Sequence, residues 1–207
     1  MLEVPYIKQP DSNSCALASY TMVGKYFFPE VTFDQLAEIS DWQKGYVIWA
    51  FKFWVWIMDK GVQIKEYDTL DYESWAKEGL EGLKRSVSEK EFNFYIKNTK
   101  DINSYSSDIE KVVKHPNFTL VREKPTFEAL EEAVKNGKVC EVVLDSRTLR
   151  DKEGFSLHRV VVVNIKENEV VFHDPAYEAY SKATKEKFTK SWLEAVSEPE
   201  LCIYERK

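Results

Sequence analysis

The chain has 207 residues, of which 43% are hydrophobic and 31% are charged. This composition supplies a core and a hydrated surface for a single domain and excludes a disordered chain. The net charge of -6 argues against a nucleic-acid partner, because phosphate binding needs a dense lysine and arginine surface. The N-terminal segment has no apolar signal-peptide core, and no stretch reaches the roughly 18 apolar residues that cross a bilayer. We therefore expect a soluble, cytoplasmic protein without a membrane partner.

The first part of the sequence predicts a helical lobe. Apolar residues at helical period follow Cys15, and the turn-rich segment 11–14 favours a helix start at that point. A capping-box pattern at Thr32 predicts a second short helix, and an aromatic helix is expected between Gly45 and Gly61.

A charged segment, 68–114, follows these helices and carries Trp75, Leu80 and Leu83 near helical spacing. The spacing predicts a mostly helical insertion attached to the helical lobe. Two interpretations of this insertion stay open: it shapes the access of a substrate, or it is a solvated decoration.

The remaining sequence predicts a sheet. Thr126 caps an expected helix that stops at Gly137, and the polar tetrad 166–169 joins two valine-rich runs as a hairpin. The expected strands are 139–144, 158–165, 170–173 and 201–204, with one more helix at 188–196. Helices followed by a sheet predict an α+β fold in one domain, 1–207, whose helical lobe at about 14–115 packs on an antiparallel sheet lobe at about 117–206.

Three cysteines, Cys15, Cys140 and Cys202, stand far apart and lack metal-ligand spacing. We therefore expect no disulfide framework, no metal and no cofactor. A lone cysteine is more often a small buried hydrophobe, and Cys140 and Cys202 fit that description because they lie in apolar strand runs. Cys15 differs, since the positive end of a helix dipole favours the reactive thiolate.

Three other residues complete a candidate site. Gln9 precedes Cys15 by six positions, so its amide can join the backbone N–H of Cys15 as an oxyanion donor. His158 opens the first hairpin strand and Asp174 follows the second, and their even separation favours one sheet face unless a bulge changes the count. Each residue alone is more often structural: a solvated glutamine, a strand-edge histidine and a turn aspartate.

Together these segments resemble the papain-like cysteine peptidases, and among them the bacteriocin-processing (double-glycine leader) peptidases and their stand-alone relatives. The resemblance rests on QPDSNSCALAS at 9–19, HRVVVV at 158–163 and Asp-Pro-Ala at 174–176. The spacing Gln-x5-Cys and the helix residues at 188–192 fit the same pattern. It covers roughly residues 1–60 and 125–205.

The resemblance implies a papain-like cysteine protease fold and a peptide or protein substrate. It also implies roles: Cys15 as nucleophile, His158 as general base and then acid, Asp174 as the orienting acid and Gln9 as oxyanion donor. Ser14 and Arg159 depart from the family, which often has glycine before the nucleophile and a small or aromatic residue after the histidine. Arg159 puts a charge near the site or on the opposite sheet face, and substrate choice stays open.

The leading hypothesis is a cysteine peptidase or amidase that works through an acyl-enzyme. The same triad could transfer the acyl group to an amine, and a peptide-binding module on this fold would need no nucleophile. A purely structural protein would make the pattern coincidental. The oligomeric state is left open. We expect no role for His115, a loop histidine, or for His173, which should face away from Asp174, and the aromatic helix is either core or partly a cleft wall.

Overall fold

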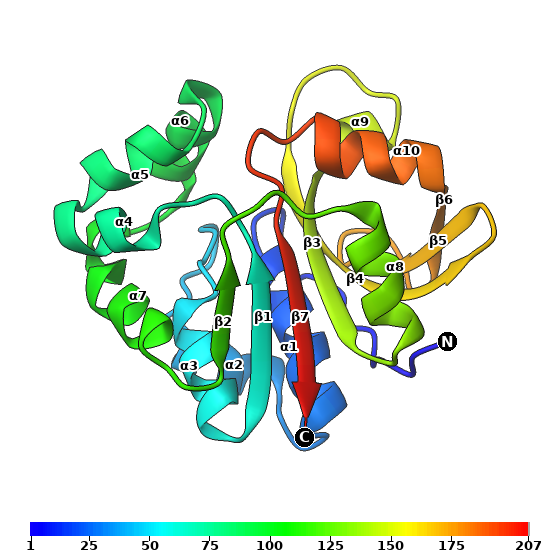
Figure 1. The fold of residues 1–207 in the computed structure, drawn as a ribbon, viewed down its shortest axis with the longest axis horizontal. Coiled ribbons are helices and arrows are strands. Elements are labelled where there is room, and N and C mark those ends of the chain that lie inside the picture. Colours follow the sequence, from blue (N-terminus) through cyan, green and yellow to red (C-terminus); the bar gives the residue numbers. More distant parts are fainter. Residues whose placement is uncertain (207) are drawn as a thin grey trace.

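A single mixed sheet runs through the computed structural model, which describes residues 1–206, and helices cover both of its faces (Figure 1). The strand order is β2-β1-β7-β3-β4-β5-β6, and all neighbours are antiparallel except β1 and β2, which are parallel. The strands are β1 Val62–Tyr67, β2 Phe118–Val121, β3 Val139–Asp145, β4 Leu157–Lys166, β5 Glu169–His173, β6 Ser181–Thr184 and β7 Leu201–Arg206.

The helices form two groups, one beside each half of the sheet (Figure 1). The first group is α1 Cys15–Phe27, α2 Phe33–Ile39, α3 Phe51–Asp59, α4 Tyr72–Glu78, α5 Leu80–Ser86, α6 Glu89–Asn98, the 3-10 helix η1 Ile102–Tyr105 and α7 Ser106–Val113. The second is α8 Phe127–Lys135, α9 Ser146–Leu149 and α10 Lys185–Thr189, which continues into the π-helical turn η2 Lys190–Glu194.

The α+β prediction, the helix start at Cys15 and the helical character of 68–114 are confirmed. The aromatic helix was expected to follow Gly45, but it begins only at Phe51. The preceding loop is held instead by tertiary contacts, because Val47 N–H donates to the Asn98 carbonyl at 2.9 Å.

Strands β1 and β2 were not predicted, and β1 lies inside the range expected for the helical lobe. β1 joins the middle of the sheet by pairing with β7, so the sheet reaches into both halves of the molecule. Its sequence, VQIKEY, is too short and too charged to distinguish a half-buried strand from a loop.

β4 separates two apolar layers. Val161 and Val163 pack in the cluster that contains α1 and α3, whereas Val160 and Val162 pack in the cluster beneath α8 and α10. Because both faces of β4 are covered, its sequence is a continuous valine run and does not alternate.

The hairpin of β4 and β5 contains one extra residue. Val162 pairs with Phe172, but the next pair towards the turn is Asn164 with Val171, so Val163 is a bulge. Beyond the bulge the register puts Val160 opposite Asp174, on the face of the sheet that His158 shares. In the register set at the turn, Val161 would stand there, and Asp174 would face away from His158. The two residues share a face as expected, but the reason given from the sequence was wrong: in the regular register at the turn an even separation puts them on opposite faces, and the bulge reverses this.

The N-terminal segment runs along this hairpin and is hydrogen-bonded to it before α1 begins. Its contacts are Leu2 N–H to the carbonyl of the bulge residue Val163 at 2.9 Å, Val4 carbonyl with His173 Nε2 at 2.8 Å, Tyr6 hydroxyl to the Asp174 carbonyl at 3.1 Å and Gln9 N–H to the Pro175 carbonyl at 2.9 Å. These bonds fix where the segment ends, and hence where α1 begins, relative to the hairpin.

Four buried carboxyl groups line one face of the central strands: Glu66, Asp68, Glu141 and Glu200. The guanidinium of Arg159 forms ion pairs with two of these carboxyl groups, Glu200 and Glu141. Both carboxyl oxygens of Glu66 lack an oxygen or nitrogen partner. Burial, followed by the charge of Glu200, raises the pKa of Asp68 to about 8, and burial raises the pKa of Glu141 to about 7.

We expect Asp68→Asn to stabilise the protein more at pH 9 than at pH 5. A carboxyl whose folded pKa is raised contributes stability below its unfolded pKa of about 4, and that contribution is lost as pH rises through about 8. The amide mimics the protonated form, so its advantage over wild type should grow by about 4 kcal/mol between pH 5 and pH 9, or about 1.4 kcal/mol for each of the roughly three pH units below the folded pKa. Urea unfolding at both pH values measures the difference.

Asp71→Asn is the matched control, because hydrogen bonds from the Ser74 backbone and hydroxyl lower the pKa of this neighbouring carboxyl. It should show no such gain at alkaline pH. Parallel stability curves for Asp68→Asn and wild type would contradict the prediction.

Candidate active site

Cys15 is the first residue of α1, the longest helix of the described chain, and no acidic residue lies in the first turn. The helix dipole therefore favours a thiolate there. Cys15 keeps 9% of its surface exposed and borders a pocket, whereas Cys140 and Cys202 are fully buried. Burial raises the pKa of both of those thiols. Of the three, Cys15 has the surroundings of a reactive cysteine.

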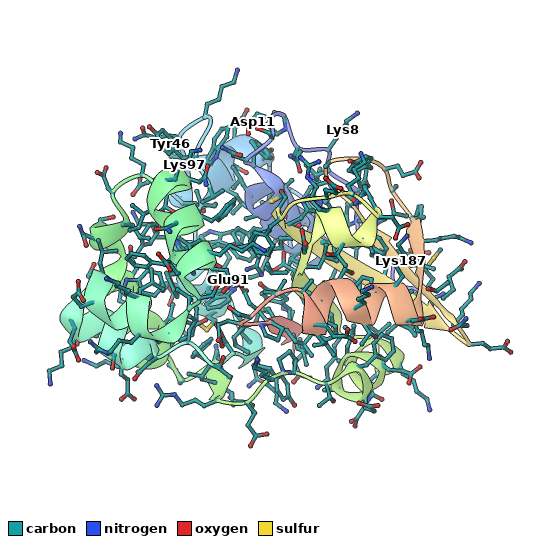
Figure 2. The ribbon with its side chains drawn as sticks, turned by 90° about the horizontal axis from the view of Figure 1, so that it is seen from above. Lys8, Asp11, Tyr46, Glu91, Lys97 and Lys187 are labelled. Atoms are coloured by element: carbon teal, nitrogen blue, oxygen red, sulfur yellow. The ribbon has the colours of Figure 1, made fainter. Side chains whose placement is uncertain are left out.

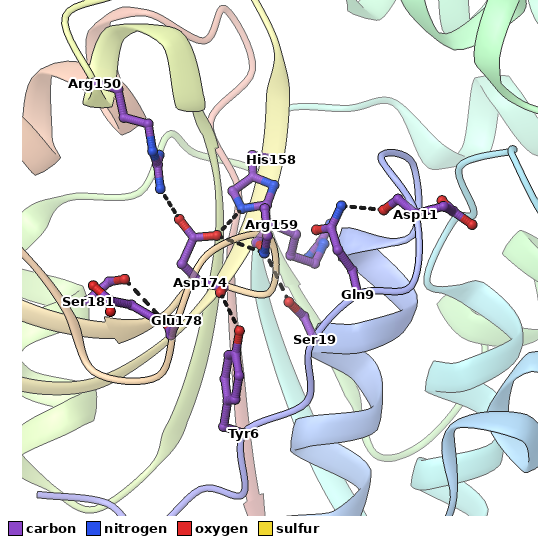
Figure 3. A network of polar contacts seen from close by, with 11 residues as sticks. Tyr6, Gln9, Asp11, Ser19, Arg150, His158, Arg159, Asp174, Glu178 and Ser181 are labelled. Carbon is purple, nitrogen blue, oxygen red and sulfur yellow. Dashed lines mark hydrogen bonds and ion pairs between the residues drawn. The ribbon is translucent and has the colours of Figure 1, made fainter.

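His158 lies between Cys15 and Asp174. Its Nε2 is 2.7 Å from Asp174 Oδ1, and both side chains are buried (Figure 3). His158 and Cys15 line the same pocket, and the side chain of His158 lowers the pKa of the Cys15 thiol. α1 is tied to this part of β4 because the Ser19 hydroxyl donates to the Arg159 carbonyl at 3.3 Å.

The three groups shift one another's pKa. Burial alone would raise the pKa of Cys15, but the hydrogen bond and charge of His158, with smaller effects of Arg159, outweigh it and lower the pKa. Burial would lower the pKa of His158, but hydrogen bonds to Asp174 and Cys15 raise it to about 9. Burial would raise the pKa of Asp174, but His158 and Arg150 lower it. The arrangement favours a thiolate, an imidazolium and a carboxylate.

Gln9 reaches the site but does not aim a donor at Cys15. Its Nε2 donates to the Asp11 carbonyl at 2.5 Å, and its Oε1 is buried without a partner (Figure 3). Gln9 borders a polar pocket together with His158. The Cys15, His158 and Asp174 side chains are thus brought together, and Gln9 stands beside them with its amide engaged locally.

Arg150 was not found from the sequence. Its guanidinium binds Asp174 Oδ2 (Figure 3). It also lies 3.6 Å from the centre of the Tyr177 ring. The Ala176 N–H donates to the other carboxylate oxygen at 3.0 Å. No spacing rule links an arginine in the loop after α9 to an aspartate after β5, so no sequence signal could have identified it.

Arg159 faces the α1 side of the sheet, one of the two positions that the sequence left open. It pairs with Glu200 at 2.5 Å, and its guanidinium lies 5.4 Å from the Tyr20 ring. With Glu200, it borders the same pocket as Cys15. Glu200 also escaped the sequence analysis, because only the pairing of β7 with β3 brings it to this position.

The pocket beside Cys15 is mainly apolar and receives residues from both halves of the molecule. Trp49 comes from the loop before α3, Phe94 and Tyr95 come from α6, and Val143 and Leu157 come from the sheet. Glu91 of α6 also binds Ser197 in the loop before β7, with Ser197 N–H donating at 3.0 Å. Figure 2 shows Glu91 in this position between the two groups of helices.

The other two histidines lie outside this site. His173 points to the opposite face as expected, where its ring contacts the Val4 carbonyl and accepts from Tyr180 N–H at 3.2 Å. His115 lies 3.4 Å from Asp59.

Across residues 1–206, no group of three or more histidine, cysteine or acidic side chains is arranged to hold a metal ion. Within the same range, every helix is too short or too polar to cross a membrane.

We expect Arg150→Gln to move the acid limb of Cys15 alkylation to higher pH. Removing the guanidinium raises the pKa of Asp174, and protonated Asp174 no longer supports the imidazolium that stabilises the thiolate. The rate constant for iodoacetamide at pH 5 should fall by about tenfold, equivalent to one pKa unit. Mass spectrometry of Cys15 over a pH series measures it.

Arg122→Gln is the control, because Arg122 pairs with Asp71 at 2.7 Å on the surface. An unchanged acid limb in Arg150→Gln would show that the guanidinium does not act through Asp174.

Comparisons with known proteins bear on the whole chain. The model of the "Peptidase_C39 like family" matches residues 1–199. A solved structure described as a C39-like peptidase from Bacillus anthracis shares 13% identity with a TM-score of 0.56, and the match covers 99% of this chain and 96% of that one. A double glycine motif protease from an AMS/PCAT transporter, solved in complex with the leader peptide, shares 15% identity with a TM-score of 0.48 and coverages of 98% and 91%. No curated protein matches the sequence.

These matches confirm the papain-like fold and the resemblance found in the sequence. Family membership indicates a cysteine peptidase in general terms. On the match of residues 1–199, the chain belongs to the Peptidase_C39 like family.

Proposed function

We propose that this protein is a cysteine peptidase or amidase with Cys15 as nucleophile, His158 as general base and acid, and Asp174 as the orienting carboxylate. The observation that carries the proposal is the surroundings of one imidazole. His158 is bonded to Asp174 at 2.7 Å, and it lines one pocket with Cys15, whose pKa it lowers. A structural histidine would have no need of a buried carboxylate on one side and a thiol on the other.

In the proposed reaction the Cys15 thiolate attacks the substrate carbonyl carbon and forms a tetrahedral oxyanion. The His158 imidazolium gives its proton to the leaving nitrogen, the C–N bond breaks, and a thioester remains on Cys15. Neutral His158 then takes a proton from water as the water attacks the thioester. The C–S bond breaks, the acid product leaves, and the proton retained by His158 restores the ion pair.

Gln9 is the proposed side-chain donor to the oxyanion, beside the backbone N–H of Cys15. A carboxamide carries two N–H groups, and one of them serves the Asp11 carbonyl. Oxyanion formation would engage the other or draw the amide away from Asp11, and such tightening in the transition state is common for groups that are misaligned in free enzymes.

We assign the helical segment 68–114 a role in substrate access. Its α6 supplies Phe94 and Tyr95 to the apolar pocket beside Cys15, and Glu91 anchors the helix to the loop before β7. A solvated decoration would not contribute a wall to that pocket. The acyl part of the substrate, which stays bonded to Cys15, would lie along this wall.

We expect iodoacetamide at pH 6 to modify Cys15 and to leave Cys140 and Cys202 unmodified in the folded protein. Only the Cys15 thiol has a lowered pKa, and the other two are buried with raised values. Peptide mapping by mass spectrometry distinguishes the three sites. Inert Cys15, with the protein shown to be folded, would favour a non-catalytic peptide-binding module.

We expect His158→Ala to lower turnover more than Asp174→Ala, because the aspartate orients the imidazole but does not move the proton. Wild-type activity should fall above pH 9 as the imidazolium loses its proton. In Asp174→Ala this alkaline limb should move to lower pH, since the carboxylate that raises the pKa of His158 is gone. Peptide cleavage over a pH series measures both effects, and wild-type activity in both variants would refute the assigned roles.

A further inference from the structure

A second, polar pocket borders His158 but not Cys15. Three cations line it, Arg147, Arg150 and Lys152, together with Gln9 and several hydroxyl groups. Among the described residues, 1–206, no acidic side chain lines this pocket. We call it the basic pocket. In a chain with a net charge of -6, the lining of this pocket carries only positive side-chain charges besides His158.

The loop that carries these cations is fixed by a buried acid. Asp145 Oδ1 accepts from Arg147 N–H at 3.1 Å and from Ser156 N–H at 2.9 Å, so one carboxylate holds both ends of the loop. The Lys152 N–H donates to the Arg147 carbonyl at 2.9 Å, which brings these two residues to one turn. The two cations are therefore presented by a closed, hydrogen-bonded loop.

Their charges are available. Arg150 is committed to Asp174 and to the Tyr177 ring. Arg147 and Lys152 are exposed, and within residues 1–206 neither side chain makes an ion pair with an acidic residue. Lys152 has an acid on each side in the sequence: Asp151 pairs with Lys187, and the exposed Glu153 does not line the pocket. The basic pocket thus presents two positive charges that no acidic lining residue neutralises.

The chemistry of the site identifies the part of a substrate that would meet this pocket. After C–N cleavage the acyl part stays on Cys15, which borders the apolar pocket. The leaving amine must be within reach of His158, which protonates it. A pocket that borders His158 and lacks Cys15 is therefore suited to the leaving fragment.

We propose that the basic pocket binds a carboxylate on the leaving fragment, so that the enzyme prefers substrates whose released part is negatively charged close to its new amino terminus. The carboxylate comes from an acidic side chain on the first leaving residue or from the C-terminus of a very short fragment. This inference rests on the proposed function for its orientation. The binding of a carboxylate by the basic pocket does not itself require catalysis.

The test uses three dipeptides that mimic the leaving fragment: Glu-Gly amide with a side-chain carboxylate, Gln-Gly with a C-terminal carboxylate, and Gln-Gly amide with neither. Calorimetric titration into Cys15→Ala protein measures binding without turnover. At least one anionic dipeptide should bind about fivefold more tightly than the neutral one, which corresponds to about 1 kcal/mol, the attraction between a carboxylate and one cation about 4 Å apart in water. Which of the two binds identifies the source of the carboxylate.

The preference should disappear in Arg147→Gln/Lys152→Gln. The matched control Lys135→Gln/Lys166→Gln removes the same charge from exposed positions outside both pockets and should keep it. Equal binding of all three dipeptides, or an equal loss of preference in the control, would overturn the proposal.

A second arm separates this proposal from the proposed function. In protein with intact Cys15, the ratio of alkylation rates for iodoacetate and iodoacetamide should fall in Arg147→Gln/Lys152→Gln and stay constant in the control, because the two reagents differ mainly in charge. If the ratio is unchanged in both variants, Arg147 and Lys152 do not attract anions to the neighbourhood of the Cys15 thiol, which contradicts the proposal. If Cys15 resists both reagents while the dipeptide preference is observed, the proposed function fails, but the proposal that the basic pocket binds a carboxylate stands.

Discussion

Asp174 shares a sheet face with His158 because β4 contains one extra residue, Val163, that has no partner in β5. The bulge at Val163 has a second effect, since its carbonyl accepts the N–H of Leu2 and so receives the N-terminal segment. That segment then bonds to the backbone of Asp174 and Pro175 before it reaches α1. One local irregularity therefore aligns the histidine with its carboxylate and fixes the start of the helix that carries Cys15.

Charged groups beyond the proposed triad also influence the site. Arg159 follows His158 in β4, and its guanidinium is held by Glu200 and Glu141 on the α1 side of the sheet. Burying such an ion pair is costly unless its geometry and hydrogen bonds are good. Tyr204 helps by donating to Glu141 at 2.6 Å. The guanidinium also lowers the pKa of Cys15, so a group that departs from the family pattern contributes to the state of the nucleophile.

Signals carried by neighbouring residues could be predicted from the sequence. The turn before Cys15, the capping box at Thr32 and the polar tetrad at 166–169 each act over a few positions, and the structure has a helix start, a capped helix and a hairpin there. What depends on distant pairing could not be predicted. β1 is a strand because β7 lies beside it, and the bulge at Val163 leaves no mark in a run of valines. Arg150 is recognisable only beside Asp174.

The site also shows how one imidazole can divide a cleft into two environments. On the side of Cys15, aromatic residues of α6 and the loop before α3 make an apolar wall, and the Arg159 and Glu200 charges that border it neutralise each other. On the other side, α9 and the loop after it present Arg147 and Lys152, which make no ion pair within residues 1–206. Apolar burial is nearly independent of salt, whereas attraction between exposed charges falls within a Debye length. Under the proposed function, ionic strength would therefore alter recognition of the leaving fragment and leave recognition of the acyl fragment almost unchanged.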